Sequence, residues 1–261
     1  MRSTEHAPQM AQDNPTRFDI ALRAARVAFN GVDIFHDLDL TLQAGSFTCL
    51  LGPSGVGKST LLRYFAGLVE GDVSGTITCS DKIALDGRVA YMAQQDLLLP
   101  WRSVLENVVL GAVLRHEKPD YEKASHLLTE VGLRDAADLR PAELSGGMKQ
   151  RAALARTLME DRPVVLMDEP FSALDPLNRL RLQELAARVL RGKTVLLVTH
   201  DPLEALRLGD RVHVLTGSPA QLQDAITPKG QSPRNIANPE ILAQQAELLG
   251  QLGAERSEGA A

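Results

Sequence analysis

One short segment of the sequence combines three glycines with a lysine and the hydroxyl pair Ser59 and Thr60: LGPSGVGKSTLL, residues 51–62. It fits the pattern G-x-x-x-x-G-K-[ST], with an apolar, strand-like run before it and helical spacing after it, which is the context this pattern requires. Glycines let successive backbone N–H groups converge on a phosphate, and the helix start adds a positive dipole end. The predicted phosphate-binding residues are Gly52, Pro53, Ser54, Gly55, Val56, Gly57, Lys58, Ser59 and Thr60.

Two side chains of this segment have separate predicted roles. The Lys58 ammonium can reach the β- and γ-phosphates of a nucleotide, and the Ser59 hydroxyl can ligate magnesium. The segment alone therefore predicts a bound nucleotide with Mg²⁺, and it does not select a reaction.

A pair of carboxylates follows a second apolar run, in RPVVLMDEP at residues 162–170. Four apolar residues place Asp168 at the carboxyl end of a buried strand, with Glu169 beside it. Asp168 would hold magnesium through the second coordination shell, and Glu169, close to the γ-phosphate, would orient and deprotonate the attacking water. Because DEP could also be only the polar end of a strand, other motifs must decide.

The segment LSGGMKQR, residues 144–151, decides the class. By composition, SGG is an ordinary turn that opens a helix, with Ser145 as its N-cap. With the glycine-rich segment before it and DEP after it, it resembles the signature of the ABC ATPase family, although Met148 stands where many members carry glutamine. The resemblance implies that this turn faces the γ-phosphate in a partner subunit's site, so that two chains enclose two ATP molecules head to tail. The predicted signature residues are Leu144, Ser145, Gly146, Gly147 and Gln150.

Two segments after the signature match the same family pattern in order. His200 in LLVTHD resembles the switch histidine that contacts the γ-phosphate and Glu169, so Glu169 and His200 are the predicted catalytic residues. A lone histidine after a strand can also be purely structural. SALD resembles the D-loop that crosses the dimer seam, which assigns to it Ser172, Ala173, Leu174 and Asp175.

Two positions before the signature complete the resemblance. Gln94 in YMAQQDLLLPW resembles the Q-loop glutamine that senses magnesium and water, and its spacing from Pro100 favours it over Gln95. Phe29 in VAFNG occupies the place of the aromatic residue that stacks on adenine, and a core side chain is the alternative. The predicted magnesium site therefore consists of Ser59, Gln94 and Asp168.

The elements that must position these residues follow from hydrophobic periodicity. Short alternating segments up to residue 51 predict strands, and the alternation of buried strands with helices after residue 146 predicts a parallel sheet. The resemblance implies an α/β fold: a P-loop NTPase (RecA-like) core with an antiparallel β subdomain and a helical ABC-specific subdomain. The predicted division is a flexible N-terminal arm (1–16), an ABC ATPase domain (17–217, helical subdomain about 96–150) and a C-terminal tail (218–261).

Composition bounds the class and the compartment. A net charge of −5 gives no electrostatic footprint for wrapping nucleic acid, so no nucleic-acid partner is expected. Cys49 and Cys79 have no metal or disulfide spacing and are expected to be reduced packing residues. Without an apolar run of about 18 residues or a signal-peptide order at the N-terminus, a soluble cytosolic chain is expected. The resemblance places it peripherally on the cytoplasmic face of the inner (plasma) membrane.

The segment QQDLLLPWRSVLENVVLG, residues 94–111, resembles importer ATPases of the nitrate, sulfonate and taurine group. In that group, the helical subdomain presents a groove to a permease, although Trp101 could instead pack internally. Longer segments look most like ATPases of thiamine-precursor (hydroxymethylpyrimidine) uptake. The resemblance implies ATP and Mg²⁺ as ligands, and as partners a second copy of the chain, integral-membrane permease subunits and a solute-binding protein.

Three other functions share part of this pattern of motifs. A small-molecule kinase would need neither the signature nor the histidine after VLLVT, and DNA-repair ABC ATPases normally carry a long coiled-coil insertion where this chain has about ninety residues. A non-transport or regulatory ABC ATPase with a different membrane partner would have the same motor. The sequence leaves that alternative open.

Overall fold

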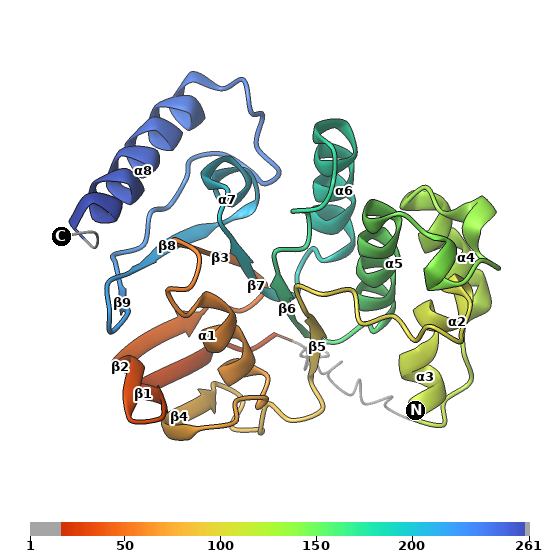
Figure 1. Cartoon of the computed structure of the whole chain (residues 1–261), viewed down its shortest axis with the longest axis horizontal. Helices are drawn as coiled ribbons and strands as arrows, with labels where there is room; N and C mark the ends of the chain where they lie inside the picture. Colours follow the sequence, from red (N-terminus) through yellow and green to blue (C-terminus); the bar gives the residue numbers. More distant parts are fainter. Residues whose placement is uncertain (1–16, 259–261) are drawn as a thin grey trace, which may run out of the picture.

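The computed structural model describes residues 17–258, so the predicted arm, residues 1–16, lies outside the described part of the chain. Two sheets organise it (Figure 1), and the larger has the order β5-β6-β7-β3-β8-β9. Strands β5 to β8 of this order run parallel, and β9 pairs antiparallel to β8. Its strands are β3 (Phe47–Leu51), β5 (Val89–Met92), β6 (Val164–Asp168), β7 (Thr194–Thr199), β8 (Arg211–Thr216) and β9 (Gln221–Leu222).

The central strands are buried along their whole length. Every residue of β3, β6 and β7 is buried, which explains why these strands appear in the sequence as continuous apolar runs. Helices cover them: α1 (Lys58–Phe65), α5 (Gly146–Met159), α6 (Pro176–Val189) and α7 (Pro202–Leu208). This arrangement confirms the predicted α/β fold class.

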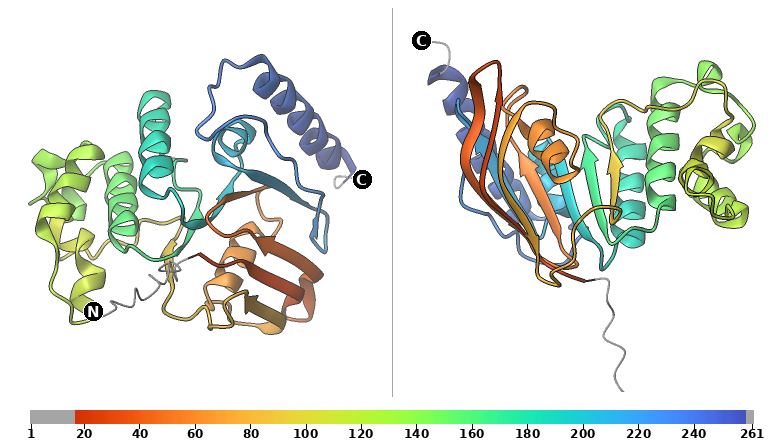
Figure 2. Two further views of the ribbon diagram at one scale, coloured as in Figure 1. Left: turned by 180° about the vertical axis from the view of Figure 1, so that it is seen from behind. Right: turned by 90° about the horizontal axis from the view of Figure 1, so that it is seen from below.

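A smaller antiparallel sheet has the order β2-β1-β4 and consists of β1 (Ile20–Phe29), β2 (Val32–Leu42) and β4 (Asp72–Cys79). Helix α1 packs between the two sheets (Figure 2), and its Leu61, Leu62 and Phe65 share a buried cluster with both. The helix that begins at the glycine-rich segment is therefore fixed from two sides.

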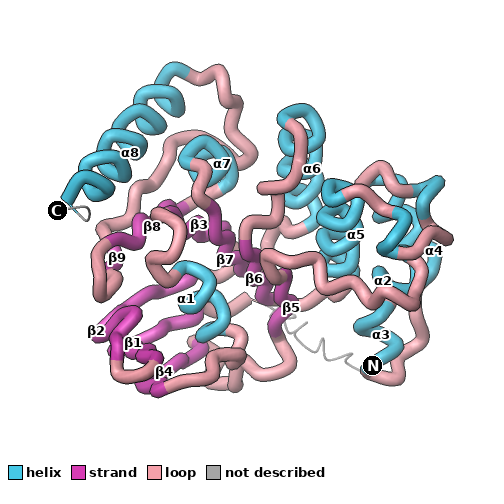
Figure 3. Tube along the Cα trace, viewed as in Figure 1, coloured by secondary structure: helices cyan, strands magenta, loops and turns pink. Residues whose placement is uncertain are grey.

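The segment between β5 and β6 contains helices and loops and no strand (Figure 3). The helical pattern over residues 104–114 forms two short helices, α2 (Val104–Val108) and α3 (Leu110–Leu114), followed by α4 (Tyr121–Glu130) and two 3₁₀ turns. The break at Val109 follows the buried Asn107, whose amide donates to the carbonyls of Leu99, Arg102 and Ser103 and fixes α2 against the preceding loop.

The chain after residue 217 packs onto the larger sheet and α7. The Arg234 guanidinium is buried and donates to the carbonyls of Leu206, Gly209, Pro228 and Lys229. Helix α8 (Pro239–Glu258) contacts α7, and its Ile241 and Leu248 belong to the main buried cluster. The described part of the predicted tail thus contributes to the core of the domain.

Leu248→Ala tests this packing. Leu248 is fully buried, so its truncation should lower the free energy of unfolding by about 2–5 kcal/mol, through lost burial and the cavity left behind. The adjacent Leu249 is 51% exposed, and Leu249→Ala should change stability by less than about 0.5 kcal/mol. Denaturant unfolding measures both, and equal effects would show that α8 does not pack as described.

Candidate active site

The predicted site segments follow four neighbouring parallel strands. In a parallel sheet, the carboxyl ends of the strands meet at one edge, where ligands bind. The register of β5, β6, β7 and β3 aligns their ends. This edge therefore collects Gln94, Asp168, Glu169, His200 and the glycine-rich segment 52–57.

Two positions of the glycine-rich segment exclude any larger residue. A Cβ on Gly52 would lie 2.4 Å from the carbonyl oxygen of Leu215, and a Cβ on Gly57 would lie 2.7 Å from Cγ2 of Ile34. Gly57 also has φ +111°, a conformation that side chains other than glycine rarely adopt. These close approaches hold the segment against β8 and β2 and fix where α1 begins.

Lys58 closes the segment from inside. Its Nζ donates to the carbonyls of Gly52 and Pro53, both at 2.8 Å, and the side chain is buried. Burial lowers the pKa of Lys58, and the neighbouring carboxylates of Glu169 and Asp168 oppose that shift. A cation with few fixed partners beside two carboxylates is suited to receive phosphate oxygens.

The Asp168 carboxylate is buried, and no described residue donates a hydrogen bond to either of its oxygens. Burial raises its pKa, and the neighbouring Ser59 hydroxyl partly opposes the rise without reaching full hydrogen-bond geometry. A buried carboxylate without donors beside a hydroxyl is a donor set that a hard divalent cation prefers. The residues present thus fit Mg²⁺.

Glu169 and His200 are in direct contact. His200 Nδ1 lies 3.1 Å from Glu169 Oε1; the histidine side chain is 55% exposed and the glutamate side chain 14%. Glu169 has φ +48°, and its N–H donates to the carbonyl of Val198 at 2.9 Å. Its own carbonyl accepts from Ser172 Oγ at 3.0 Å and from Gln150 Nε2 at 3.1 Å. The two predicted catalytic residues are therefore adjacent, and the glutamate is held by its backbone.

Two other predicted residues lie at the surface. Phe29 is 39% exposed and lines a hollow of about 380 Å³ together with Thr60, Arg63 and Tyr91, so its ring is not a core side chain. Gln94 is exposed in the loop after β5, as is Gln95.

The signature turn is also accessible. Ser145 and Gly146 are exposed, and Ser145 caps α5 by accepting a hydrogen bond from the N–H of Met148 at 3.3 Å. A Cβ on Gly147 would lie 3.4 Å from the carbonyl of Ala173, so the turn lies beside the predicted D-loop of the same chain. In that loop Leu174 is buried, whereas Asp175 caps α6.

Gln150 lies apart from the exposed residues of the signature turn. Grouped by sequence with the signature residues that face a partner's ATP, it is instead 6% exposed on the inner face of α5. Its amide donates to the carbonyls of Glu169 and Pro170, at 3.1 and 3.0 Å, so its hydrogen bonds go to its own subunit. Helical spacing could have suggested an inward position, but no signal in the sequence indicated its partners.

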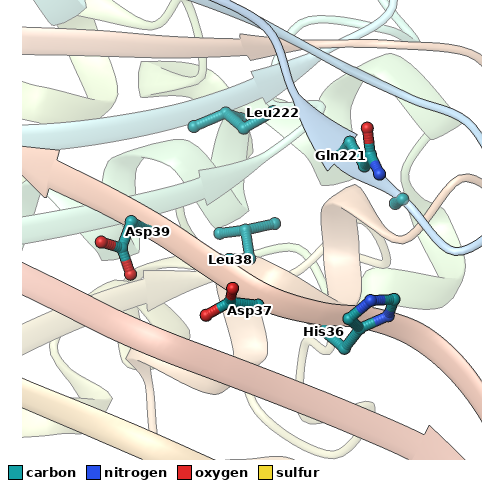
Figure 4. A pocket seen from close by; sticks show the side chains of 7 residues that line it. His36, Asp37, Leu38, Asp39, Gln221 and Leu222 are labelled. Carbon is teal, nitrogen blue, oxygen red and sulfur yellow. The ribbon is translucent and has the colours of Figure 1, made fainter.

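A hollow of about 400 Å³ lies away from these residues, between β2 and β9 (Figure 4). Its lining includes His36, Asp37 and Asp39 from β2 and Gln221 and Leu222 from β9. None of the motif residues takes part in it. Among the described residues, no group of three or more His, Cys, Asp and Glu is arranged to hold a metal.

A glycine-rich loop joins a parallel strand to a helix, and a buried aspartate stands at the carboxyl end of another strand of the same sheet. This combination defines a P-loop NTPase. The ABC transporter family model matches residues 35–172. An uncharacterized ABC transporter ATP-binding protein of Haemophilus influenzae is 45% identical over 244 residues, 91% of this chain and all of that protein. The aliphatic sulfonates import ATP-binding protein SsuB 1 of Rhodococcus jostii is 45% identical over 223 residues, 85% of this chain and 88% of that protein.

The fold resembles that of a solved cassette. The dimeric structure of MJ0796, a bacterial ABC transporter cassette, has a TM-score of 0.71 and 27% identity, and covers 81% of this chain and 100% of that one. The chain therefore belongs to the ABC transporter family, as its ATP-binding and ATP-hydrolysing subunit. No helix in the described residues is long and apolar enough to span a bilayer.

Glu204 is a buried titratable group that the sequence did not single out. It lies in α7, four residues after His200, and its Oε2 accepts from Gln183 Nε2 at 3.1 Å. Burial raises the pKa of Glu204 from 4.5 to about 7; Asp201 adds to the rise, and hydrogen bonds from Thr199 and Gln183 oppose it.

This shift predicts a pH-dependent stability. The folded protein holds the Glu204 proton more tightly than the unfolded chain does. The contribution of this proton to the free energy of unfolding is therefore complete below pH 4.5 and is lost as pH rises to about 7. Glu204→Gln removes this dependence, and between those pH values its unfolding free energy should gain up to about 3 kcal/mol relative to the parent. Denaturant unfolding across this range, with the exposed Glu122→Gln as control, measures it; a constant difference would contradict the shift.

Proposed function

We propose that two copies of this chain enclose two ATP molecules and hydrolyse them to power a membrane importer. The observation that carries this proposal is the contact between Glu169 and His200, beside the buried Asp168 and the Lys58 loop. These residues follow separate strands and meet at one edge of the sheet, as a reaction on a phosphate bound at that edge requires.

Each group of residues has a distinct part in binding. The glycine-rich segment 52–57 offers its backbone N–H groups to the phosphates, and Lys58 exchanges its two carbonyl partners for phosphate oxygens. The exposed ring of Phe29 is available to stack on adenine. Ser59, Asp168 and Gln94 would hold Mg²⁺, which supplies charge neutralisation at the phosphate oxygens.

Glu169 is the proposed general base. Its carboxylate orients a water molecule and accepts its proton as the water oxygen attacks the γ-phosphorus, while the bond to the β-phosphate oxygen breaks and ADP leaves. His200, bonded through Nδ1 to that carboxylate, keeps it oriented and contacts the γ-phosphate.

The second half of each site is proposed to come from the partner copy. Ser145 and Gly146 are exposed at the start of α5, as a turn that donates to another subunit's phosphate must be. The MJ0796 cassette was solved as a dimer, and a post-hydrolysis state of it was bound to ADP and Pi, which supports this arrangement. The D-loop, residues 172–175, would then lie at the seam.

The proposed membrane partner is a permease, with a solute-binding protein supplying the cargo. Leu97, Trp101 and Leu114 are exposed on the helical segment, so Trp101 does not pack internally and is free to contact a permease at the cytoplasmic face of the membrane. The SsuB relatives of Rhodococcus jostii and Delftia acidovorans are named for aliphatic sulfonate import. These names favour an aliphatic sulfonate, or a related nitrate- or taurine-like compound, as the cargo over a hydroxymethylpyrimidine.

Glu169→Gln tests the proposed chemistry. Loss of the base should lower ATP turnover by about 10²- to 10⁴-fold while nucleotide binding persists, because the amide keeps the shape of the carboxylate. The trapped complex should then sediment as a dimer in Mg²⁺ and ATP and as a monomer without them. Turnover at the parent rate would contradict the assignment of Glu169.

A further inference from the structure

A single buried side chain joins the signature helix to the catalytic glutamate of the same chain. Gln150 stands near the start of α5, within two turns of the exposed signature turn. Both hydrogen bonds of its amide nitrogen go to the Glu169–Pro170 backbone, at 3.1 and 3.0 Å. Because the side chain is buried, no water replaces these bonds if the amide is removed.

The backbone that receives these bonds is strained. Glu169 has φ +48°, a left-handed conformation that persists in a residue other than glycine only when its surroundings hold it. Its N–H is fixed by Val198 of β7, whereas its carbonyl is fixed by Gln150 and Ser172. The backbone that carries the Glu169 carboxylate is therefore held from both sides, and Gln150 supplies one of these contacts.

The start of α5 is also bound to the helical segment. The adjacent Arg151 guanidinium donates to the carbonyls of Val131 and Gly132, at 2.8 and 2.9 Å, and to that of Gly147 at 3.4 Å. Arg151 thus links the first turns of α5, including the signature turn, to the end of α4. If these parts move together, the Gln150 amide moves with them.

We propose that Gln150 is a positioning residue that couples the two ATP sites of the dimer. Each chain's signature turn binds the ATP held by its partner, and the same chain's Gln150 fixes its own Glu169 in the hydrolytic orientation. Nucleotide at one site thereby sets the base at the other. This inference rests on the proposed function, since it requires Glu169 to be the base and the signature turn to contact the partner's ATP.

The test uses the purified full-length chain with Mg²⁺ and ATP. Gln150→Glu keeps the shape of the side chain but removes both N–H donors, and Gln150→Leu removes them without adding charge. Both should lower kcat by about 10- to 100-fold, as expected for a misplaced base, with KM for ATP near the parent value. The Hill coefficient for ATP should fall toward unity, which loss of packing alone would not cause.

Thr157→Val is the matched control on α5. Thr157 is buried, and within the described part of the chain its hydroxyl donates only to the carbonyl of Ala153 in the same helix, so kcat and the Hill coefficient should stay at parent values. Parent kcat and cooperativity in both Gln150 variants would overturn the coupling. So would parallel losses of thermal stability, ATP binding and kcat, which would give Gln150 a structural role only. Parent turnover in Glu169→Gln would instead overturn the proposed function itself.

Discussion

Asp168 ends a fully buried strand with a carboxylate that no donor in the described chain reaches. Such a group is costly to keep ionised unless a cation accompanies it, and Lys58 and the Ser59 hydroxyl are its neighbours in the adjacent segment. A divalent cation bound here, as proposed, would neutralise this carboxylate and bring phosphate oxygens to the same edge of the sheet. The two glycines that admit no side chain let the loop lie close against β8 and β2, and the loop placed in this way holds Lys58 near the carboxylates.

Helix α5 serves two neighbours at once. Its exposed first residues are available to a second subunit, and its buried face carries the Gln150 amide to the backbone of Glu169. The parallel sheet supplies the fixed frame, since β6 and β7 hold Glu169 and His200 at one edge. In this arrangement, binding between subunits and the orientation of the base depend on the same helix, so pairing and hydrolysis are linked without any additional element.

The sequence predicted what local pattern determines. The glycine-rich segment and the buried strands β3, β6 and β7 are recognisable because each is a short run of residues with clear boundaries in the sequence. Glu169 and His200 follow neighbouring strands of this set, and the parallel sheet brings them together. Tertiary contacts determine the rest. Helical spacing could indicate that Gln150 points inward, but not that its amide reaches the backbone of Glu169. The chain after residue 217 has a tail-like composition but is anchored by Arg234. The burial of Glu204 could not be predicted from the sequence pattern either.

Each ATP site is proposed to be shared by two copies of the chain. Ser145→Arg would block the signature turn, and Lys58→Ala would disable the phosphate-binding loop, so each variant alone should be inactive. In a mixture, one chain's intact loop meets the other's intact turn, and ATP turnover should appear that neither variant has by itself. A mixture no more active than the sum of its two components would contradict the shared site.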